Sequence, residues 1–117
     1  MKAGRNAIEF LRDILESIEK IEQFTGGFEF DTFSKDDKTV YAVIRALEIM
    51  GEATKNLPDS LKEEHPEVPW RLMAGIRDKV IHGYFVVDLP IIWNTVKKDV
   101  PELHPLIADI LEEFESV

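Results

Sequence analysis

Two long stretches of this chain place their apolar residues at a helical spacing, and this periodicity constrains the fold more than any other feature. In the first stretch, apolar residues recur every three or four positions from Ile8 to Ile21. In the second stretch they recur in the same way from Val40 to Leu57. Such spacing places the apolar side chains on one face of an amphipathic helix. The two stretches therefore predict two long helices that each bury one face.

Glycine, serine and proline residues predict where these two helices begin and end. Gly26-Gly27 is a typical helix C-terminus, and we expect the partly aromatic segment Phe28–Phe33 to form a loop. Ser34 is a good N-cap for the second helix, and Pro58 closes it. One short helical turn is expected over residues 59–64.

The second half of the chain predicts two or three further helices. A third helix opens at Pro69-Trp70 and runs to Gly83, after which Tyr84 to Val87 is extended. Asp88 caps a fourth helix, with Pro90 in its first turn. Pro101 kinks or ends that helix, and a last helix follows. With no convincing strand, the chain is predicted to be all-α, an antiparallel bundle of four or five helices in one domain spanning residues 1–117.

Composition excludes several classes of function. The chain has 117 residues and no cysteine, which excludes disulfides and thiolate chemistry. No apolar run approaches the roughly 20 residues that span a bilayer, so we expect no membrane segment and a cytoplasmic location. The net charge of −9 argues against a surface that coats nucleic acid. A local basic window remains, because Arg71, Arg77 and Lys79 are opposed only by Asp78 between residues 68 and 86.

That window contains the residues best suited to chemistry. Arg77 suits the stabilisation of charge on a phosphate, and His82 suits proton transfer near neutral pH. Tyr84 follows the glycine at which the helix is predicted to end, so its hydroxyl is free to project. A purely structural interpretation also exists, because cations near a helix C-terminus favour the macrodipole and such a tyrosine often only packs.

Helical geometry does not make Arg77 and His82 neighbours. Five residues advance the side chain by about 500°, which leaves the two about 140° apart on a straight helix. Either the long arginine side chain sweeps around the helix, or two copies of the third helix meet across a twofold axis and complete each other's site. We prefer the twofold arrangement. Asp78 lies four residues before His82, where it is expected to orient the imidazole.

Three other groups of residues are weaker candidates. Arg45, Glu48 and Glu52 share one helical face, as an ion-pair ladder or as a shell that orients Arg77 or His82. The three histidines lack the spacing of a metal site, so no metal and no cofactor are expected. Trp70 and Trp93 fall on apolar stripes and are expected in the core.

Three blocks of sequence together resemble the HepT-like proteins of the HEPN class of helical ribonucleases. The first runs from Pro69-Trp70-Arg71 through Ala74-Gly75-Ile76-Arg77-Asp78-Lys79-Val80-Ile81-His82-Gly83-Tyr84-Phe85. The second is Arg45–Ala53. The third runs from Val87-Asp88-Leu89 through Trp93 to Asp99-Val100-Pro101. The blocks occur in order and cover nearly the whole chain.

The resemblance implies a homodimeric, HEPN-like helical bundle whose arginine and histidine form a metal-independent ribonuclease centre. Many such proteins are toxins encoded beside a MntA-type nucleotidyltransferase antitoxin, which transfers AMP to the motif tyrosine. By this resemblance Arg77 and His82 are catalytic, Tyr84 is the modification target, and RNA is the substrate. Asp78, Glu48 and Glu52 are expected to support the site. The rival hypothesis is a non-catalytic helical module that docks a nucleotidyltransferase partner.

Overall fold

The computed structural model describes the backbone of residues 2–82 and 86–116, and the side chains of residues 7–81 and 87–116. Helices dominate, and the two strands have two residues each. The elements in chain order are α1 (Lys2–Thr25), α2 (Phe30–Lys35), α3 (Asp37–Lys55), α4 (Asp59–Glu64), α5 (Trp70–Ala74), α6 (Ile76–Val80), β1 (Ile81–His82), β2 (Val86–Val87), α7 (Leu89–Asn94), the π-helical turn η1 (Thr95–Asp99) and α8 (Val100–Glu115). The all-α, HEPN-like fold class is confirmed.

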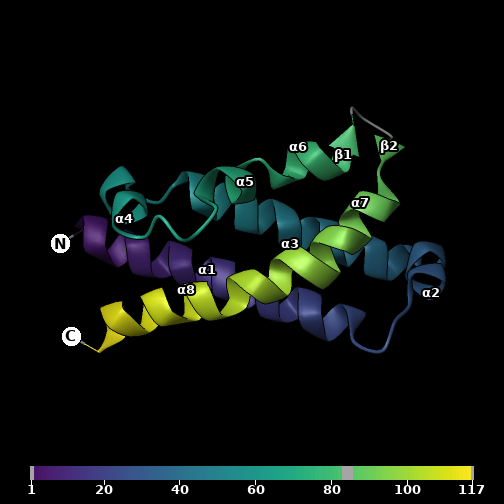
Figure 1. Ribbon diagram of the computed structural model, residues 1–117, viewed down its shortest axis with the longest axis horizontal. Helices are drawn as coiled ribbons and strands as arrows, with labels where there is room; N and C mark the ends of the chain where they lie inside the picture. Colours follow the sequence, from purple (N-terminus) through teal and green to yellow (C-terminus); the bar gives the residue numbers. More distant parts are fainter. Residues whose placement is uncertain (1, 83–85, 117) are drawn as a thin grey trace.

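The long helices lie along an elongated molecule of 45 × 29 × 22 Å (Figure 1). Helix α1 packs against both α3 and α8, and α3 carries α5 and α6 on its side away from α1. The start of α1 and the end of α8 lie at the same end of the long axis. This arrangement makes α3 the support on which the segment with Arg77 rests.

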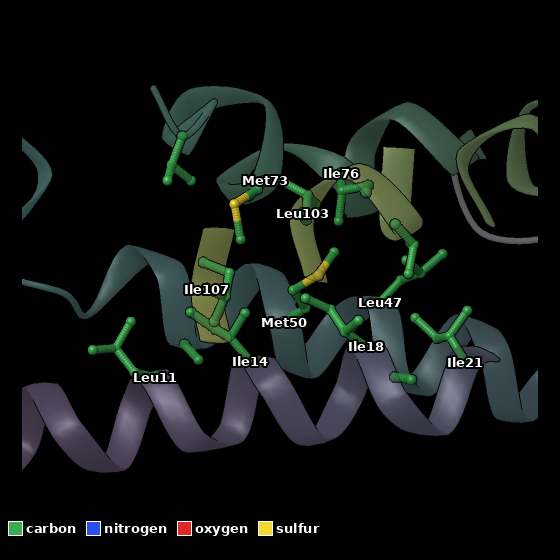
Figure 2. Packing of buried hydrophobic residues seen from close by; sticks show 14 of the residues in the cluster. Leu11, Ile14, Ile18, Ile21, Leu47, Met50, Met73, Ile76, Leu103 and Ile107 are labelled. Carbon is green, nitrogen blue, oxygen red and sulfur yellow. The ribbon is translucent and has the colours of Figure 1, made fainter. Parts of the chain in front are cut away.

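The predicted apolar stripes of the two long helices form the centre of the core. Ile14 and Ile18 of α1 are fully buried and lie near Leu47 and Met50 of α3 (Figure 2). Met73 of α5 is also fully buried, so the core includes this helix. The buried hydrophobic side chains among the described residues form one cluster. Burial of apolar area at about 25 cal/mol per Å² is the main force that holds these helices together.

The segment from Phe28 to Phe33 is not a loop throughout, as predicted, because α2 begins within it at Phe30. Phe33 is fully buried, and its ring centroid lies 4.9 Å from that of Trp93 in α7. This long-range aromatic contact stabilises a helix too short to form alone. The predicted N-cap of the following helix was also wrong, since the Asp36 carboxylate caps it by accepting a hydrogen bond from the Thr39 amide at 3.0 Å.

The third helix is shorter than predicted. It is divided at Gly75 into α5 and α6 and ends at Val80 rather than at Gly83. Ile81 has extended backbone angles, and Ile81 and His82 pair antiparallel with Val87 and Val86. β-branched residues favour such extended pairing over a further helical turn. A small hairpin therefore replaces the predicted helix end, and its connection, residues 83–85, lies outside the described residues.

The predicted fourth and last helices form one continuous helical run. Asp88 caps α7 as predicted, accepting a hydrogen bond from the Ile91 amide at 3.1 Å. Thr95 and Val100 keep α-helical angles where α7, η1 and α8 join, so Pro101 does not end the run. A proline ring crowds the carbonyl four residues earlier in a helix, which for Pro101 is the carbonyl of Lys97. Because Lys97 lies in the wider π turn, the helical run accommodates the ring.

Two further sequence predictions have structural outcomes. The short helical turn expected over residues 59–64 is α4. Trp70 is buried as expected, and its indole Nε1 donates a hydrogen bond to the His65 carbonyl at 2.9 Å. In the part of the chain that the structure describes, no helix has the length and hydrophobicity needed to cross a membrane.

Candidate functional site

The site begins with a close approach between α3 and the α5–α6 segment. A Cβ atom at Gly51 of α3 would lie 3.2 Å from the carbonyl oxygen of Met73 and 3.5 Å from that of Ala74. Only glycine leaves this space free, so the backbone at the end of α5 rests directly on α3. Because α6 follows at once, this contact sets where Arg77 lies relative to the α3 surface.

Arg77 projects from α6 onto Glu48 of α3. Its Nε atom donates a hydrogen bond to Glu48 Oε2 at 3.2 Å, and its Nη1 atom lies 3.6 Å from Asp78 Oδ1. The Arg77 side chain is 54% exposed, whereas that of Glu48 is 32% exposed. An ion pair this solvated adds little to stability. Its main effect is to orient a guanidinium that still faces solvent.

Glu48 lies between two arginines. Its other carboxylate oxygen, Oε1, is 3.9 Å from Nη1 of Arg45, one helical turn earlier in α3. The sequence left two interpretations of this helical face: an ion-pair ladder within α3, or a shell that orients Arg77 or His82. Glu48 forms an ion pair within α3, with Arg45, and also contacts Arg77, so the two interpretations are compatible.

An open groove runs between α1 and α3 beside these charges. It encloses about 350 Å³ and reaches Arg77. Glu52, predicted to support the site, lines the same groove but makes no ion pair with the described residues. The principal lining side chains are Phe10 and Asp13 of α1, Arg45, Glu48, Ile49 and Glu52 of α3, and Arg77.

The structure places His82 in a strand rather than on a helix. Its backbone in β1 pairs with Val86, two residues after α6 ends at Val80. The sequence analysis placed His82 on the same helix as Arg77 and Asp78, about 140° from the first and one turn after the second. Because the helix ends at Val80, neither relation applies. Asp78 instead has its carboxylate near Arg77. The side chain of His82 and the whole of Tyr84 lie outside the described residues, so their roles stay predictions.

The basic window seen in the sequence is balanced by acidic residues from other elements. Lys79 Nζ lies 3.7 Å from Asp99 Oδ2 of η1, and Arg77 is held by Glu48. The contact between Lys79 and Asp99 was not predicted, because they are distant in the chain. It connects α6 to the helical run of α7, η1 and α8, whereas Arg77 connects α6 to α3.

The remaining histidines are engaged elsewhere. His104 Nδ1 lies 2.7 Å from Glu22 Oε1, and His65 Nδ1 lies 3.4 Å from Glu67 Oε2. The described residues contain no group of three or more histidine, aspartate or glutamate side chains placed to hold a metal ion. The arrangement around Arg77 can bind an anion through an oriented guanidinium.

Comparison with known proteins agrees with the three sequence blocks. The model of the family described as "Ribonuclease HepT-like" matches residues 14–110, a span that includes α3, Arg77 and His82. No solved structure gives a significant match.

Curated relatives match over most of their length. A protein from Thermococcus cleftensis named "Probable ribonuclease HepT" is 56% identical over 99 residues, which cover 85% of this chain and 90% of the relative. A protein from Methanocaldococcus jannaschii with a provisional RNase name is 49% identical over 111 residues, 92% of each chain. Another provisionally named RNase, from Caldanaerobacter subterraneus, is 44% identical over 104 residues, 89% of this chain and 93% of the relative.

These matches place the Arg77–His82 segment and the α3 face that holds Arg77 inside a region shared with named ribonucleases. The likeness extends from α1 to α8 and is not confined to a short motif. The chain therefore belongs to the HepT-like ribonuclease family.

Proposed function

We propose that this protein is a metal-independent endoribonuclease whose Arg77 and His82 act together in a homodimer. The observation that carries the proposal is the orientation of Arg77. Glu48 and Asp78 fix the guanidinium, half of whose side chain is open to solvent, beside a groove. Family membership supports RNA as the substrate.

The reaction that fits these groups is a transesterification within RNA. A histidine imidazole takes the proton from a ribose 2′-hydroxyl, whose oxygen attacks the adjacent phosphorus. The bond from phosphorus to the 5′-oxygen breaks, and that oxygen receives a proton from an imidazolium. His82 acts as the base or the acid, with His82 of the second copy available for the other role. Arg77 stabilises the charge on the phosphorane-like transition state. The products are a 2′,3′-cyclic phosphate and a 5′-hydroxyl.

The supporting residues have distinct roles in this proposal. Glu48 orients Arg77 through its Nε atom, and Asp78 limits the movement of the same guanidinium. Glu52 adds to the electrostatic field of the groove. Tyr84 holds the RNA backbone through its hydroxyl. None of these steps requires a metal ion.

A gel-based cleavage assay tests this proposal with the purified protein. We expect His82→Ala to reduce RNA cleavage by about 10²- to 10⁴-fold, the usual contribution of a general acid or base. His65→Ala is the matched control, because its side chain contacts Glu67 and does not line the groove. Cleavage should persist in excess chelator and leave cyclic phosphate ends. Undiminished cleavage by His82→Ala, or strict dependence on added Mg²⁺, would reject the proposal.

We further propose that the protein is the toxin of a toxin–antitoxin pair and that AMP transfer to Tyr84 silences it. An adenylyl group would add bulk and negative charge where the RNA phosphate must bind. The chain offers an internal control, since its other tyrosine, Tyr41, is 76% exposed on α3. Incubation with a MntA-type nucleotidyltransferase and ATP should add AMP to wild type and Tyr41→Phe but not to Tyr84→Phe. Modification that persists in Tyr84→Phe would contradict the assignment.

The alternative function is a non-catalytic module that docks a nucleotidyltransferase. Two observations favour it: the net charge of −9, and the carboxylates of Glu48 and Asp78 that already neutralise Arg77. Under this alternative, purified protein without AMP binds its partner but cleaves no RNA. The cleavage assay above separates the two functions directly.

A further inference from the structure

Helix α6 carries a cation on each side of its buried face. Ile76 and Val80, one turn apart, are both buried and hold this face in the core. At about 100° per residue, Arg77 lies about 80° to one side of the centre of that face and Lys79 about 80° to the other. With five residues, α6 is too short to be stable alone, so its orientation depends on its contacts with other elements.

The two cations reach carboxylates on different elements. Arg77 Nε donates a hydrogen bond to Glu48 Oε2 of α3 at 3.2 Å, and Lys79 Nζ lies 3.7 Å from Asp99 Oδ2 of η1. Apolar contacts hold α6 against the core, but because they are non-directional they oppose its rotation about its own axis only weakly. A charged contact on each flank opposes rotation in both directions. The contact between Lys79 and Asp99 therefore contributes to the orientation of Arg77 on the opposite flank.

Asp99 is better suited to this role than a surface carboxylate. Its side chain is 18% exposed, less than that of any other carboxylate in an ion pair between described residues. Water and salt therefore screen its attraction to Lys79 less than they screen a surface pair. The next residue, Val100, is fully buried and fixes the backbone from which the carboxylate projects.

The π-helical turn η1 gives Asp99 its place beside α6. Ile92, Val96 and Val100 are all buried, although each follows the one before by four residues. In an α-helix every such step drifts by about 40°, so Val100 would lie about 80° away from Ile92 around the helix. The wider π turn offsets this drift and keeps Val100 in the core. Asp99 consequently lies at the edge of the core, where Lys79 of α6 reaches it.

We propose that Asp99 is a positioning residue for the RNA-cleaving site. By holding Lys79 it fixes the rotation of α6, and with it the place of the Arg77 guanidinium. Strand β1 follows α6 directly at Ile81, so the same rotation sets where the backbone of His82 begins. Neither Asp99 nor Lys79 needs to contact RNA. The catalytic consequence rests on the proposed function, whereas the effect on α6 does not.

Steady-state cleavage kinetics test the positioning role. Asp99→Asn keeps the size of the side chain and removes its charge. We expect kcat to fall about tenfold with little change in KM, because a displaced Arg77 loses stabilisation of the transition state rather than binding of RNA.

Glu102→Gln is the matched control for this substitution. Glu102 lines the same hollow of about 230 Å³ as Asp99, but it forms no ion pair with the described residues. Its substitution removes one negative charge from the same surface and should leave kcat at the wild-type value. Equal losses in the two variants, or no loss in Asp99→Asn, would overturn the proposal.

A double-mutant cycle separates this role from general destabilisation. Lys79→Met removes the ammonium but retains a long, unbranched side chain, and it should reduce kcat as Asp99→Asn does. If both residues act through their contact, the double variant should be no slower than either single variant. Lys79→Arg keeps the charge and should retain most of the activity. Additive losses in the double variant, or a Lys79→Arg variant as slow as Lys79→Met, would contradict the shared role.

Hydrogen–deuterium exchange tests the effect on α6 without reference to catalysis. Amides of residues 76–81 should exchange about three- to fivefold faster in Asp99→Asn than in wild type, the scale of one lost ion pair. Amides of α3 should be unchanged, and Glu102→Gln should match wild type in both segments. Equal exchange of α6 in wild type and Asp99→Asn would overturn the proposal.

These readouts distinguish failure of this inference from failure of the proposed nuclease. Faster exchange of α6 in Asp99→Asn, with no RNA cleavage by the wild-type protein, supports the hold on α6 and rejects the nuclease. Cleavage that is lost in His82→Ala but unaffected by Asp99→Asn rejects the positioning role and leaves the nuclease standing.

Discussion

The core of α1, α3 and α8 and the site segment, residues 76–87, are built by different means. The core helices are long, and their apolar stripes are almost completely buried. The site segment consists of the five-residue helix α6 and two-residue strands. Ile76 and Val80 anchor it in the core, and three polar contacts join it to other elements: Arg77 to Glu48, Lys79 to Asp99, and the Asp88 amide to the Val80 carbonyl at 2.9 Å. The core supplies stability, whereas the site segment depends on the core for its position.

The largest expected effect separates these two roles. Leu47→Ala removes a fully buried side chain at the centre of the core. It should lower the free energy of unfolding by about 2–5 kcal/mol, from lost burial and the cavity left behind. RNA cleavage per folded molecule should change little. Thermal or denaturant unfolding measures the first quantity, and the cleavage assay below the transition measures the second. A large loss of cleavage with unchanged stability would contradict this division of roles.

A smaller effect is expected where the core meets the site segment. Gly51→Leu would force side-chain atoms against the Met73 carbonyl, 3.2 Å from the Cβ position. We expect a loss of about 1–3 kcal/mol in stability from overpacking, together with reduced cleavage because Arg77 moves relative to Glu48.

Gly75→Leu provides the matched control for that substitution. A Cβ atom there would lie 3.5 Å from the Arg71 carbonyl oxygen, at ordinary contact distance, and the position is exposed. Chemical denaturation and cleavage of both variants should show the larger losses for Gly51→Leu. Equal losses would show that the approach of α5 to α3 does not position the site.

The smallest change tests the site alone. Glu48→Gln keeps the shape of the side chain but removes the charge that orients Arg77, so we expect cleavage to fall about tenfold, the scale of one weakened charge-assisted hydrogen bond. Stability should change by less than about 1 kcal/mol, because the pair is solvated. Glu52→Gln, which lines the same groove without an ion pair among the described residues, should have a weaker effect. A stronger effect of Glu52→Gln would reverse the two supporting roles.

The same contrast explains what the sequence could predict. Helices α1, α3 and α4 and the Asp88 cap depend on signals within each segment, namely apolar periodicity and local capping, and all were predicted, although α3 is capped by Asp36 and not by Ser34. Helix α2, the division at Gly75 and the short hairpin depend on contacts between distant residues, such as Phe33 with Trp93. Local sequence patterns do not predict contacts between distant residues.

The candidate site divides in a similar way. Residue chemistry and the family resemblance predicted Arg77, and helical spacing predicted Glu48 as a supporting residue. The structure brings these two together across 29 positions of the chain. The geometry used to relate Arg77 to His82 was wrong, because it assumed that the helix continued past Val80. The pairing of Lys79 with Asp99 was missed, since no local pattern joins α6 to η1.

The central claim, that Arg77 of one copy acts with His82 of the other, is tested most directly by mixing inactive variants. Arg77→Ala and His82→Ala are each purified, unfolded together and refolded to form mixed dimers. If each site takes Arg77 from one copy and His82 from the other, one site in every mixed dimer is intact. Random pairing should then restore about a quarter of wild-type cleavage. Cleavage that stays at the level of the separate variants, with mixed dimers verified by mass, would contradict the shared site.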